Sequence, residues 1–432
     1  MPKILIRPGF ILSGGDNWDL SSDSEILIED GIIAYLGHCR GYVVGEIDRI
    51  IEGNSKLVMP GLVNTHTHAA MVLFRSFADD MPLMEWLEKK IWPAEARLNN
   101  EDIYWGTMLA ISEMIRGGTT CFADMYFHMD DVARACLESG IRASLAQGLI
   151  GIDPEKGTAG LKQSKSLISS WHGAGEGRIT MMLGPHAPYT CPPRYLQDVM
   201  SIADILKVPL HIHLAETRDE VRECLDKWGK RPVELMDSIG LFAQRVLAAH
   251  CVHLNDGEIK ILAEKQVSVA HNPGSNLKLG SGIAPLKDLL TAGAHVSLGT
   301  DGAASNNNLD MLEELRLAAL LAKGFHEDPT AIPARQALKL ATVNGAQALF
   351  LEEGLGMLKE GAPADLIMLD LQKPHFNPHH DLCAHLVYAA AAADVELVMV
   401  KGKLLMEKRE LLTIDEERVL YEANRRAERL TR

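Results

Sequence analysis

The stretch GLVNTHTH (residues 61–68) is a short apolar run that ends in two histidines. Helical patterns such as NEDIYWGTMLAISEMIRGG (residues 100–118) alternate with runs of this kind along the chain. Seven more such runs follow: TTCFADM (119–125), IRASLAQGL (141–149), ITMMLGPH (179–186), PLHIHLAE (209–216), VLAAHCV (246–252), VSVAHNP (267–273) and HVSLGTDG (295–302). Strands that alternate with helices predict a parallel sheet with crossover helices. Eight such units predict an α/β fold, a (β/α)8 TIM-type barrel.

The two ends of the chain have a different sequence pattern, without long helical stretches between the predicted strands. Residues 1–57 contain short apolar strands separated by Gly, Asn and Asp turns, and ADLIMLDL (364–371) and VELVMVKGKLLM (395–406) repeat this pattern near the other end. Each group is too small to bury a core alone. We therefore predict that residues 1–57 and 361–432 pair into one small β-sandwich domain, and that residues 58–360 form the barrel.

Composition narrows the classes of partner. The chain has 432 residues, 47% of them hydrophobic, and a formal net charge of −15, which argues against binding nucleic acid. No apolar run is long enough to span a membrane, and no signal peptide is evident. The seven cysteines are scattered without a C-x-x-C pair, which is typical of a reducing compartment. We expect a cytoplasmic protein with neither a membrane nor a nucleic-acid partner.

The carboxyl ends of the eight predicted strands are rich in ionisable residues. In a (β/α)8 barrel these ends meet at one face, where the active site lies. The residues concerned are His66, His68, Asp124, His186, His213, Glu216, His250, His271 and Asp301.

Two of these strands offer paired histidines. His66 and His68 lie two apart in a strand, so both side chains point to the same face. His211 and His213 repeat this spacing, but one ion needs only about four protein ligands. We choose His213 because it lies nearer the carboxyl rim, and Asp301 adds a carboxylate. This donor set predicts one divalent ion, with zinc preferred, and it also suits iron, manganese or nickel.

Two further groups are candidates for proton transfer. Glu216 follows His213 by three residues and could protonate a ring nitrogen while water attacks the adjacent carbon. The simpler interpretation of one glutamate in an acidic chain is a surface residue. His250 ends the sixth predicted strand and could hold the attacking water, whereas His253 should lie in the following loop.

Together these runs resemble the amidohydrolase superfamily. PGLVNTHTH, HIHLAE, LAAHCV and LGTDG carry the general resemblance. A narrower resemblance, to the 5′-methylthioadenosine/S-adenosylhomocysteine deaminases, rests on longer segments and runs nearly end to end. These segments are FRSFADDMPLMEWLEKKIWPAEARL (74–98), GPHAPYTCPP (184–193), HNPGSNLKLGSGIAP (271–285) and DGAASNNNLDMLEE (301–314).

The resemblance implies roles for individual residues. Glu216 would shuttle a proton to the purine ring, Asp301 would also accept a proton from the attacking water, and His250 would support that water. Binuclear relatives commonly bridge two ions with a lysine on the fourth strand, and ITMMLGPH has none, which favours a single ion. The implied metal ligands are His66, His68, His213 and Asp301.

The resemblance also implies contacts with a nucleoside substrate. Glu95 would hydrogen-bond the ribose hydroxyls and His186 would contact the nucleoside. Many family members carry an arginine near the end of the third strand, which helps to bind the 5′ substituent. Gln147 stands there in this chain, and it cannot pair with a carboxylate as a guanidinium does. The preferred substrate is therefore open among methylthioadenosine, adenosine and other 5′-modified adenosines.

The leading functional hypothesis is hydrolytic deamination of an adenosine analogue to the matching inosine and ammonia. One alternative is deamination or hydrolysis of another heterocycle, such as guanine, cytosine or a triazine. Another is a cyclic-amide hydrolase, against which the missing lysine counts, and a third is a non-catalytic barrel that acts as a binding protein. We also expect a homo-oligomer.

Overall fold

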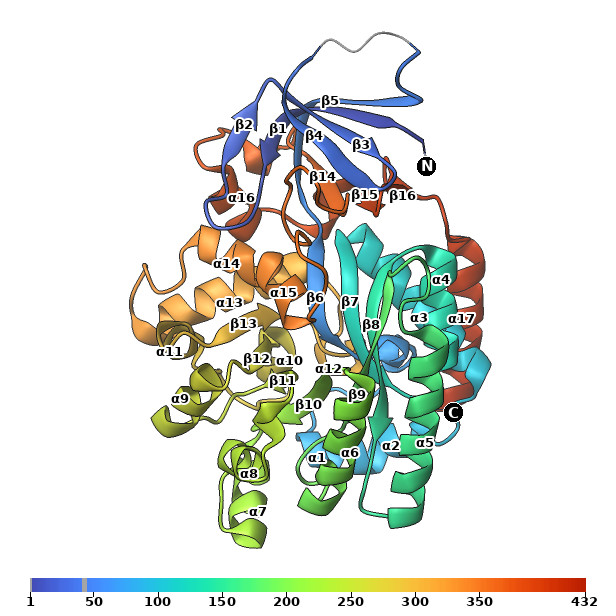
Figure 1. Cartoon of the computed structure of the whole chain (residues 1–432), viewed down its shortest axis with the longest axis vertical. Coiled ribbons are helices and arrows are strands. Elements are labelled where there is room, and N and C mark those ends of the chain that lie inside the picture. Colours follow the sequence, from blue (N-terminus) through green and yellow to red (C-terminus); the bar gives the residue numbers. More distant parts are fainter. Residues whose placement is uncertain (1, 41–44) are drawn as a thin grey trace.

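Eight parallel strands form one of the two β-sheets in the computed structural model, which describes residues 2–40 and 45–432 (Figure 1). Every run predicted as a barrel strand forms one, and neighbours in sequence are neighbours in the sheet. The (β/α)8 barrel is thereby confirmed. The strands are β6 (Leu62–Thr67), β7 (Thr119–Tyr126), β8 (Arg142–Leu149), β9 (Ile179–Pro185), β10 (Leu210–Leu214), β11 (Val246–His250), β12 (Ser268–His271) and β13 (His295–Leu298).

The last strand of the barrel lies against the first. The backbone N–H of Asp301, just after β13, donates to the carbonyl of His66 at 2.9 Å. The Thr65 hydroxyl donates to the carbonyl of Leu298 at 2.8 Å. Because the eight strands are parallel, all their carboxyl ends face the same opening.

Helices connect the strands and cover the outside of the barrel (Figure 1). Several begin at a side chain that accepts a hydrogen bond from the first turn, as Asn99, Asp153, Thr217 and Asn255 do. They are α3 (Asn100–Arg116), α4 (Met129–Ser139), α5 (Pro154–Trp171), α6 (Pro193–Leu206), α7 (Arg218–Trp228), α8 (Pro232–Ser238), α9 (Asp256–Glu264), α10 (Pro273–Lys278), α11 (Leu286–Thr291), α12 (Ala303–Asn306), α13 (Met311–His326), α14 (Ala334–Leu340) and α15 (Val343–Ala348).

The amino-terminal end of the barrel is closed by apolar packing. Small inward-facing side chains such as Ala123, Ala146 and Ala270 belong to one buried cluster with Ala346 of α15 and the following Leu349. The polar strand ends therefore face solvent only at the opposite, carboxyl end.

The second sheet joins the two ends of the chain, as predicted. Its strand order is β17-β16-β15-β14-β5-β1-β3-β4, with β2 paired to β1. The amino-terminal strands are β1 (Ile4–Leu12), β2 (Leu20–Ser22), β3 (Ser24–Glu29), β4 (Ile32–His38) and β5 (Arg49–Pro60). The carboxyl-terminal strands are β14 (Leu366–Asp370), β15 (Val395–Val400), β16 (Lys403–Glu407) and β17 (Glu410–Leu411), with α16 (Leu382–Tyr388) between β14 and β15.

This sheet curls around its own core. Ile28 of β3 and Met399 of β15 belong to one buried cluster although their strands lie far apart in the sheet order. The turn after β3 meets the turn after β15, since a Cβ on Gly402 would lie 2.7 Å from the Cα of Gly31. The curled sheet thus has the enclosed core expected of a small sandwich.

The two sheets are joined closely. Only Gly61 separates β5 from β6, and a Cβ there would lie 2.1 Å from the Thr120 hydroxyl, so the position requires glycine. Buried Arg142 at the start of β8 pairs with Asp365 beside β14 at 2.9 Å. The last helix, α17 (Glu416–Thr431), packs against α3 on the outside of the barrel. The boundaries at residues 57/58 and 360/361 stay a prediction.

In the part of the chain that the structure describes, no helix is both long and apolar enough to cross a membrane. All seven cysteines are free thiols, and six of them are buried.

Candidate active site

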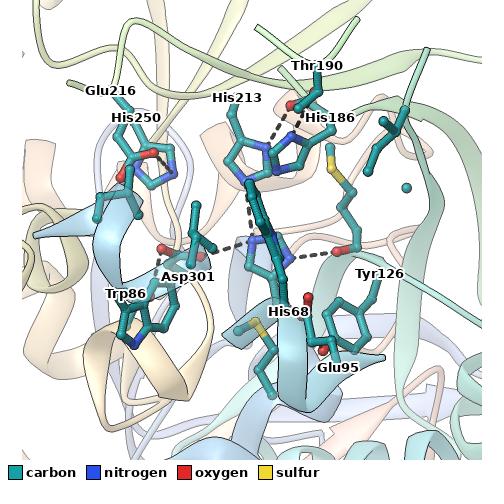
Figure 2. Close-up of a pocket in the computed structure, with 18 of the residues that line it drawn as sticks. His68, Trp86, Glu95, Tyr126, His186, Thr190, His213, Glu216, His250 and Asp301 are labelled. Atoms are coloured by element: carbon teal, nitrogen blue, oxygen red, sulfur yellow. Dashed lines mark hydrogen bonds and ion pairs between the residues drawn. The ribbon is translucent and has the colours of Figure 1, made fainter. Parts of the chain in front are cut away.

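Two histidines at the carboxyl rim face each other across the opening of the barrel. The Nδ1 atom of His68 lies 2.6 Å from the carbonyl of Met125, and Nδ1 of His213 lies 2.8 Å from the carbonyl of His186 (Figure 2). A carbonyl only accepts hydrogen bonds, so each Nδ1 carries the proton and each neutral ring presents a lone pair at Nε2. The two Nε2 atoms are 3.2 Å apart. Two lone pairs at this separation need a proton or a cation between them.

His66 and Asp301 converge on the same point. The Nε2 atom of His66 is buried and has no hydrogen-bond partner. It lies 3.4 Å from Oδ1 of Asp301, and Nε2 of His68 lies 3.2 Å from the same oxygen. The potential ligand atoms of His66, His68 and His213 all lie within 4.8 Å of one another. The four predicted metal ligands are therefore brought together.

Two serine hydroxyls behind the cluster orient the Asp301 carboxylate. Ser275 and Ser305 donate to its Oδ2 at 2.6 and 2.8 Å, which leaves Oδ1 facing the histidines. The backbone at Asp301 is left-handed, with φ of 60°, and turns the chain sharply at the rim. Nothing in the spacing of residues indicated these serines beyond their place in the quoted family segments.

The charges of the cluster fit a bound cation. Burial lowers the pKa of His66 to about 4. Burial also acts to lower the pKa of His68, but the hydrogen bond and charge of Asp301 raise it to about 9. The buried carboxylate thus requires a positive charge beside it, which a proton on His68 or a divalent ion would supply. Three imidazoles and one carboxylate are a donor set that suits zinc.

His211 lies one layer deeper than His213. It is fully buried, and its Nε2 atom lies 2.8 Å from Nδ1 of His66, behind the cluster. The structure therefore brings His213 into the cluster and places His211 against the back of His66.

Glu216 and His250 lie next to each other on one side of the cluster. Oε2 of Glu216 is 3.9 Å from Nε2 of His250, and the Ser281 hydroxyl lies 3.4 Å from Oε1. Burial raises the pKa of the Glu216 carboxyl above its ordinary value. On the far side of its ring, Nδ1 of His250 lies 2.9 Å from Oδ1 of Asn276. A carboxyl group that can carry a proton thus stands beside the cluster.

A cleft of about 810 Å³, including its mouth, opens over the cluster. The segment of short helices α1 (Leu83–Trp86), η2 (Leu87–Ile91) and α2 (Trp92–Glu95) forms one wall. That wall is largely apolar, and its lining residues include Leu83, Trp86, Leu87 and Trp92.

Glu95 lines the cleft from this segment. Its Oε1 accepts a hydrogen bond of 2.6 Å from the Tyr126 hydroxyl, and burial raises its pKa. In the view of Figure 2, Glu95 and Tyr126 lie on the opposite side of His68 from Glu216 and His250. Tyr126 was missed in the sequence, although it follows Asp124 by two residues and so shares its face of β7.

His186 also lines the cleft. Its Nδ1 atom lies 2.9 Å from the Thr190 hydroxyl, and burial lowers its pKa to about 4. His186 is therefore neutral near pH 7 and offers a ring nitrogen or an apolar ring face to a ligand.

Gln147 is not brought into the cleft. Its neighbour Ala146 faces the barrel interior, so Gln147 points outward toward the helices, where its Oε1 is buried without a partner. Gly148 and Ile150 line the cleft instead. The alternation of side chains along the strand was the signal that could have corrected this interpretation.

Comparison with known proteins identifies the family. The model of the amidohydrolase family matches residues 57–405. This chain belongs to the amidohydrolase family. The resemblance predicted from the motifs is confirmed.

Curated relatives of this amidohydrolase narrow the comparison. A 5-methylthioadenosine/S-adenosylhomocysteine deaminase of Moorella thermoacetica is 55% identical over 99% of both chains. One of Dictyoglomus thermophilum is 57% identical over 88% of this chain and 89% of the relative.

Two solved structures similar to this amidohydrolase hold zinc. An adenosine deaminase from Xanthomonas campestris with bound zinc superposes with a TM-score of 0.93 at 35% identity, over 99% of this chain and 98% of the other. An atrazine chlorohydrolase from Arthrobacter aurescens complexed with zinc has a TM-score of 0.91 at 26% identity, over 98% and 100%. A divalent metal ion at the His/Asp cluster agrees with both.

Proposed function

We propose that this chain catalyses the hydrolytic deamination of 5′-substituted adenosines, giving the corresponding inosine derivatives and ammonia. The substrates include 5′-methylthioadenosine, S-adenosylhomocysteine and adenosine. The observation that carries the proposal is that one cleft joins the His/Asp cluster and the buried Glu216 to a second, half-buried carboxylate, Glu95. The names of the relatives at 55% and 57% identity support it.

One divalent ion, with zinc preferred, would be held by His66, His68, His213 and Asp301. When bound, such an ion supplies Lewis acidity and makes water acidic enough to act as a nucleophile near neutral pH. The orphaned Nε2 of His66 and the facing lone pairs of His68 and His213 support this assignment.

The protein's own groups would move the protons. Glu216 protonates N1 of the purine as the water oxygen bonds to C6, and its raised pKa suits a group that must carry a proton. Asp301 accepts a proton from the attacking water, and His250 orients that water. Asp301 passes its proton to the amino group, the C6–N6 bond breaks, and ammonia leaves. The hydroxyl proton that remains on C6 returns to Glu216, which gives the C6 carbonyl of the inosine product and restores both carboxyl groups.

Glu95 would accept hydrogen bonds from the ribose hydroxyls. The Tyr126 hydroxyl holds one carboxylate oxygen, which fixes the plane of the carboxylate toward the cleft. His186, neutral and beside the cluster, would contact the nucleoside. We leave Gln147 out of the proposed substrate contacts because it points away from the cleft.

The lining of the cleft favours an uncharged 5′ substituent. Among the described residues that line it, none is lysine or arginine, whereas Trp86, Leu87 and Ile150 offer apolar surface. A methylthio group can bury its carbon and sulfur there, but the carboxylate of homocysteine would find no cation within one chain. We therefore propose methylthioadenosine ahead of S-adenosylhomocysteine.

Three further expectations belong to the same proposal. The chain works in the cytoplasm, forms a homo-oligomer, and divides into a composite domain of residues 1–57 and 361–432 and a barrel of residues 58–360. The buried free thiols are compatible with a reducing compartment.

An ultraviolet absorbance screen of the purified, zinc-loaded protein tests the function. Adenine nucleosides should show the spectral change from adenosine to inosine, with release of one ammonia per turnover. Guanine, cytosine and atrazine serve as the competing heterocycles. Turnover of one of these three with no change in any adenine nucleoside would overturn the proposal.

A further inference from the structure

A sharp bend between β10 and α7 presents Glu216 to the cleft. Ala215 has a φ of 52°, in the left-handed region that residues other than glycine and asparagine adopt rarely. The bend turns the chain between His213, which faces the metal cluster, and Glu216, which lines the cleft. The direction of the Glu216 side chain therefore depends on what stabilises this bend.

The carboxylate of Glu220 binds both peptide N–H groups of the bend. Its Oε1 accepts from the N–H of Ala215 at 2.9 Å, and its Oε2 accepts from the N–H of Glu216 at 2.8 Å. Glu220 lies in the first turn of α7 and is buried, with 6% of its surface exposed. The backbone N–H of Glu220 donates to the Thr217 hydroxyl at 3.1 Å, which fixes the position of the Glu220 backbone and so the origin of its side chain.

This contact differs from ordinary helix capping. The third residue of a helix commonly reaches back to the N–H of the N-cap residue, as Glu258 does toward Asn255 at 3.0 Å in α9. Glu220 holds the same position in α7 but reaches past the N-cap, Thr217, to the two residues before it. Its hydrogen bonds thus serve the bend rather than the helix end.

The same bend is tied to the neighbouring strand end. The carbonyl of Ala215 accepts from the N–H groups of Val252 and His253 at 3.0 and 2.9 Å, just after His250. The bend is therefore fixed from both sides, by Glu220 on its N–H groups and by the segment after β11 on its carbonyl.

We propose that Glu220 is a positioning residue for Glu216, which it aims at the substrate by holding the two N–H groups of the left-handed bend. The inference rests on the proposed proton transfer by Glu216. Glu220 does not line the cleft, so it does not contact the substrate itself.

A double-mutant cycle on the zinc-loaded enzyme tests this. In Glu220→Gln the amide nitrogen replaces one acceptor and faces a backbone N–H, so we expect kcat per bound zinc to fall about 10- to 100-fold. Zinc content should stay unchanged, and KM for methylthioadenosine should change less than about twofold, because neither the ligands nor the ribose contacts move. In a Glu216→Gln background, Glu220→Gln should lower kcat no further.

Two variants separate positioning from loss of stability. Glu258→Gln alters the buried glutamate at the same helical position in α9, which pairs with Arg231 and does not bind the N–H groups of the bend. It should lower the melting temperature and change kcat per bound zinc less than Glu220→Gln does. Ala215→Gly keeps the left-handed conformation but removes its steric cost, because glycine has no Cβ. It should therefore restore part of the kcat lost in Glu220→Gln, and it also supplies a folded background if the single variant is unstable.

Two kinetic outcomes would overturn the inference. One is a wild-type kcat in Glu220→Gln. The other is a fall in kcat on adding Glu220→Gln to Glu216→Gln that equals the fall it causes in the wild-type enzyme. Failure of the proposed function would look different, because the wild-type enzyme would deaminate no adenine nucleoside. Amide hydrogen exchange then decides the inference without a substrate. Exchange at Ala215 and Glu216 should rise in Glu220→Gln, and unchanged exchange would refute the role.

Discussion

The two walls of the cleft are built in different ways. The polar wall stands on strand ends, where the backbone carbonyls of Met125 and His186 fix the rings of His68 and His213. The apolar wall consists of one-turn helices in residues 83–95, on which Trp86 is buried and Trp92 is 40% exposed. The residues proposed for catalysis thus lie at the ends of the barrel strands. The residues proposed to contact the rest of the substrate lie on a segment outside the barrel sheet. Changes to the first wall should abolish the reaction, whereas changes to the second should alter the choice of substrate.

The largest effect should come from His213→Ala on the polar wall. Loss of one of four ligands opens the metal site, so zinc and activity should disappear together. Elemental analysis should find about one ion per chain in the wild type and almost none in the variant.

His211→Ala is the matched control on the same strand. It removes a histidine that lies behind His66 and should keep at least part of the metal. The assignment of the pair is reversed if His211→Ala empties the site and His213→Ala does not.

Glu216→Gln should have the next largest effect. The variant keeps the shape of the side chain and the metal, but it cannot protonate N1. General acid–base catalysis contributes about 10²–10⁴-fold, so kcat should fall by at least that factor. Stopped-time assays on the zinc-loaded variant measure it, and near wild-type turnover would remove Glu216 from the mechanism.

On the second wall, Glu95→Gln should change selectivity more than catalysis. A hydrogen bond to a charged group contributes about 1.5–3 kcal/mol, so kcat/KM for adenosine should fall about 10- to 100-fold. The value for 2′-deoxyadenosine should fall less, which narrows the ratio between the two. Tyr104→Phe removes a tyrosine–glutamate hydrogen bond on the surface, to Glu138, and should leave the ratio unchanged. Equal losses for both nucleosides in Glu95→Gln would contradict ribose recognition.

The smallest effect concerns the 5′ substituent. Ile150 lines the cleft and is 43% exposed, so Ile150→Arg adds a cation at the mouth without burying it. An exposed ion pair contributes up to about 1 kcal/mol, so kcat/KM for S-adenosylhomocysteine should rise about three- to fivefold while that for methylthioadenosine does not. Ile205→Arg adds the same charge on α6, where the side chain is 74% exposed, and should do nothing. A wild-type enzyme that already prefers S-adenosylhomocysteine would indicate that another cation reaches the cleft.

The polar wall was predictable because its geometry follows from short-range rules. Side chains two apart on a strand share a face, and the carboxyl ends of barrel strands share an opening, so His66, His68, His213 and Asp301 could be grouped from the sequence. The same alternation, applied from Ala146, would have placed Gln147 on the outer face of β8.

The apolar wall and the supporting contacts were not predictable in this way. Tyr126 and Glu95 meet through a hydrogen bond between segments 31 residues apart, and no local pattern sets where α2 lies over the barrel. Glu220 is a common type of residue in a common helical position, and only its distances to Ala215 and Glu216 distinguish it from Glu258. Contacts made by loops and short helices depend on packing that residue spacing does not encode.

The sheet formed by strands from both ends of the chain has a consequence for folding during synthesis on the ribosome. Strand β5 leaves the ribosome early but pairs with β14, where Met59 lies opposite Ile367. These residues are roughly 300 positions apart, and synthesis at about 5–20 residues per second separates them by about 15–60 s. During that interval the edge of β5 is exposed, one residue away from β6, which carries His66 and is followed by His68. Translation must therefore nearly finish before His66 and His68 rest on a completed support.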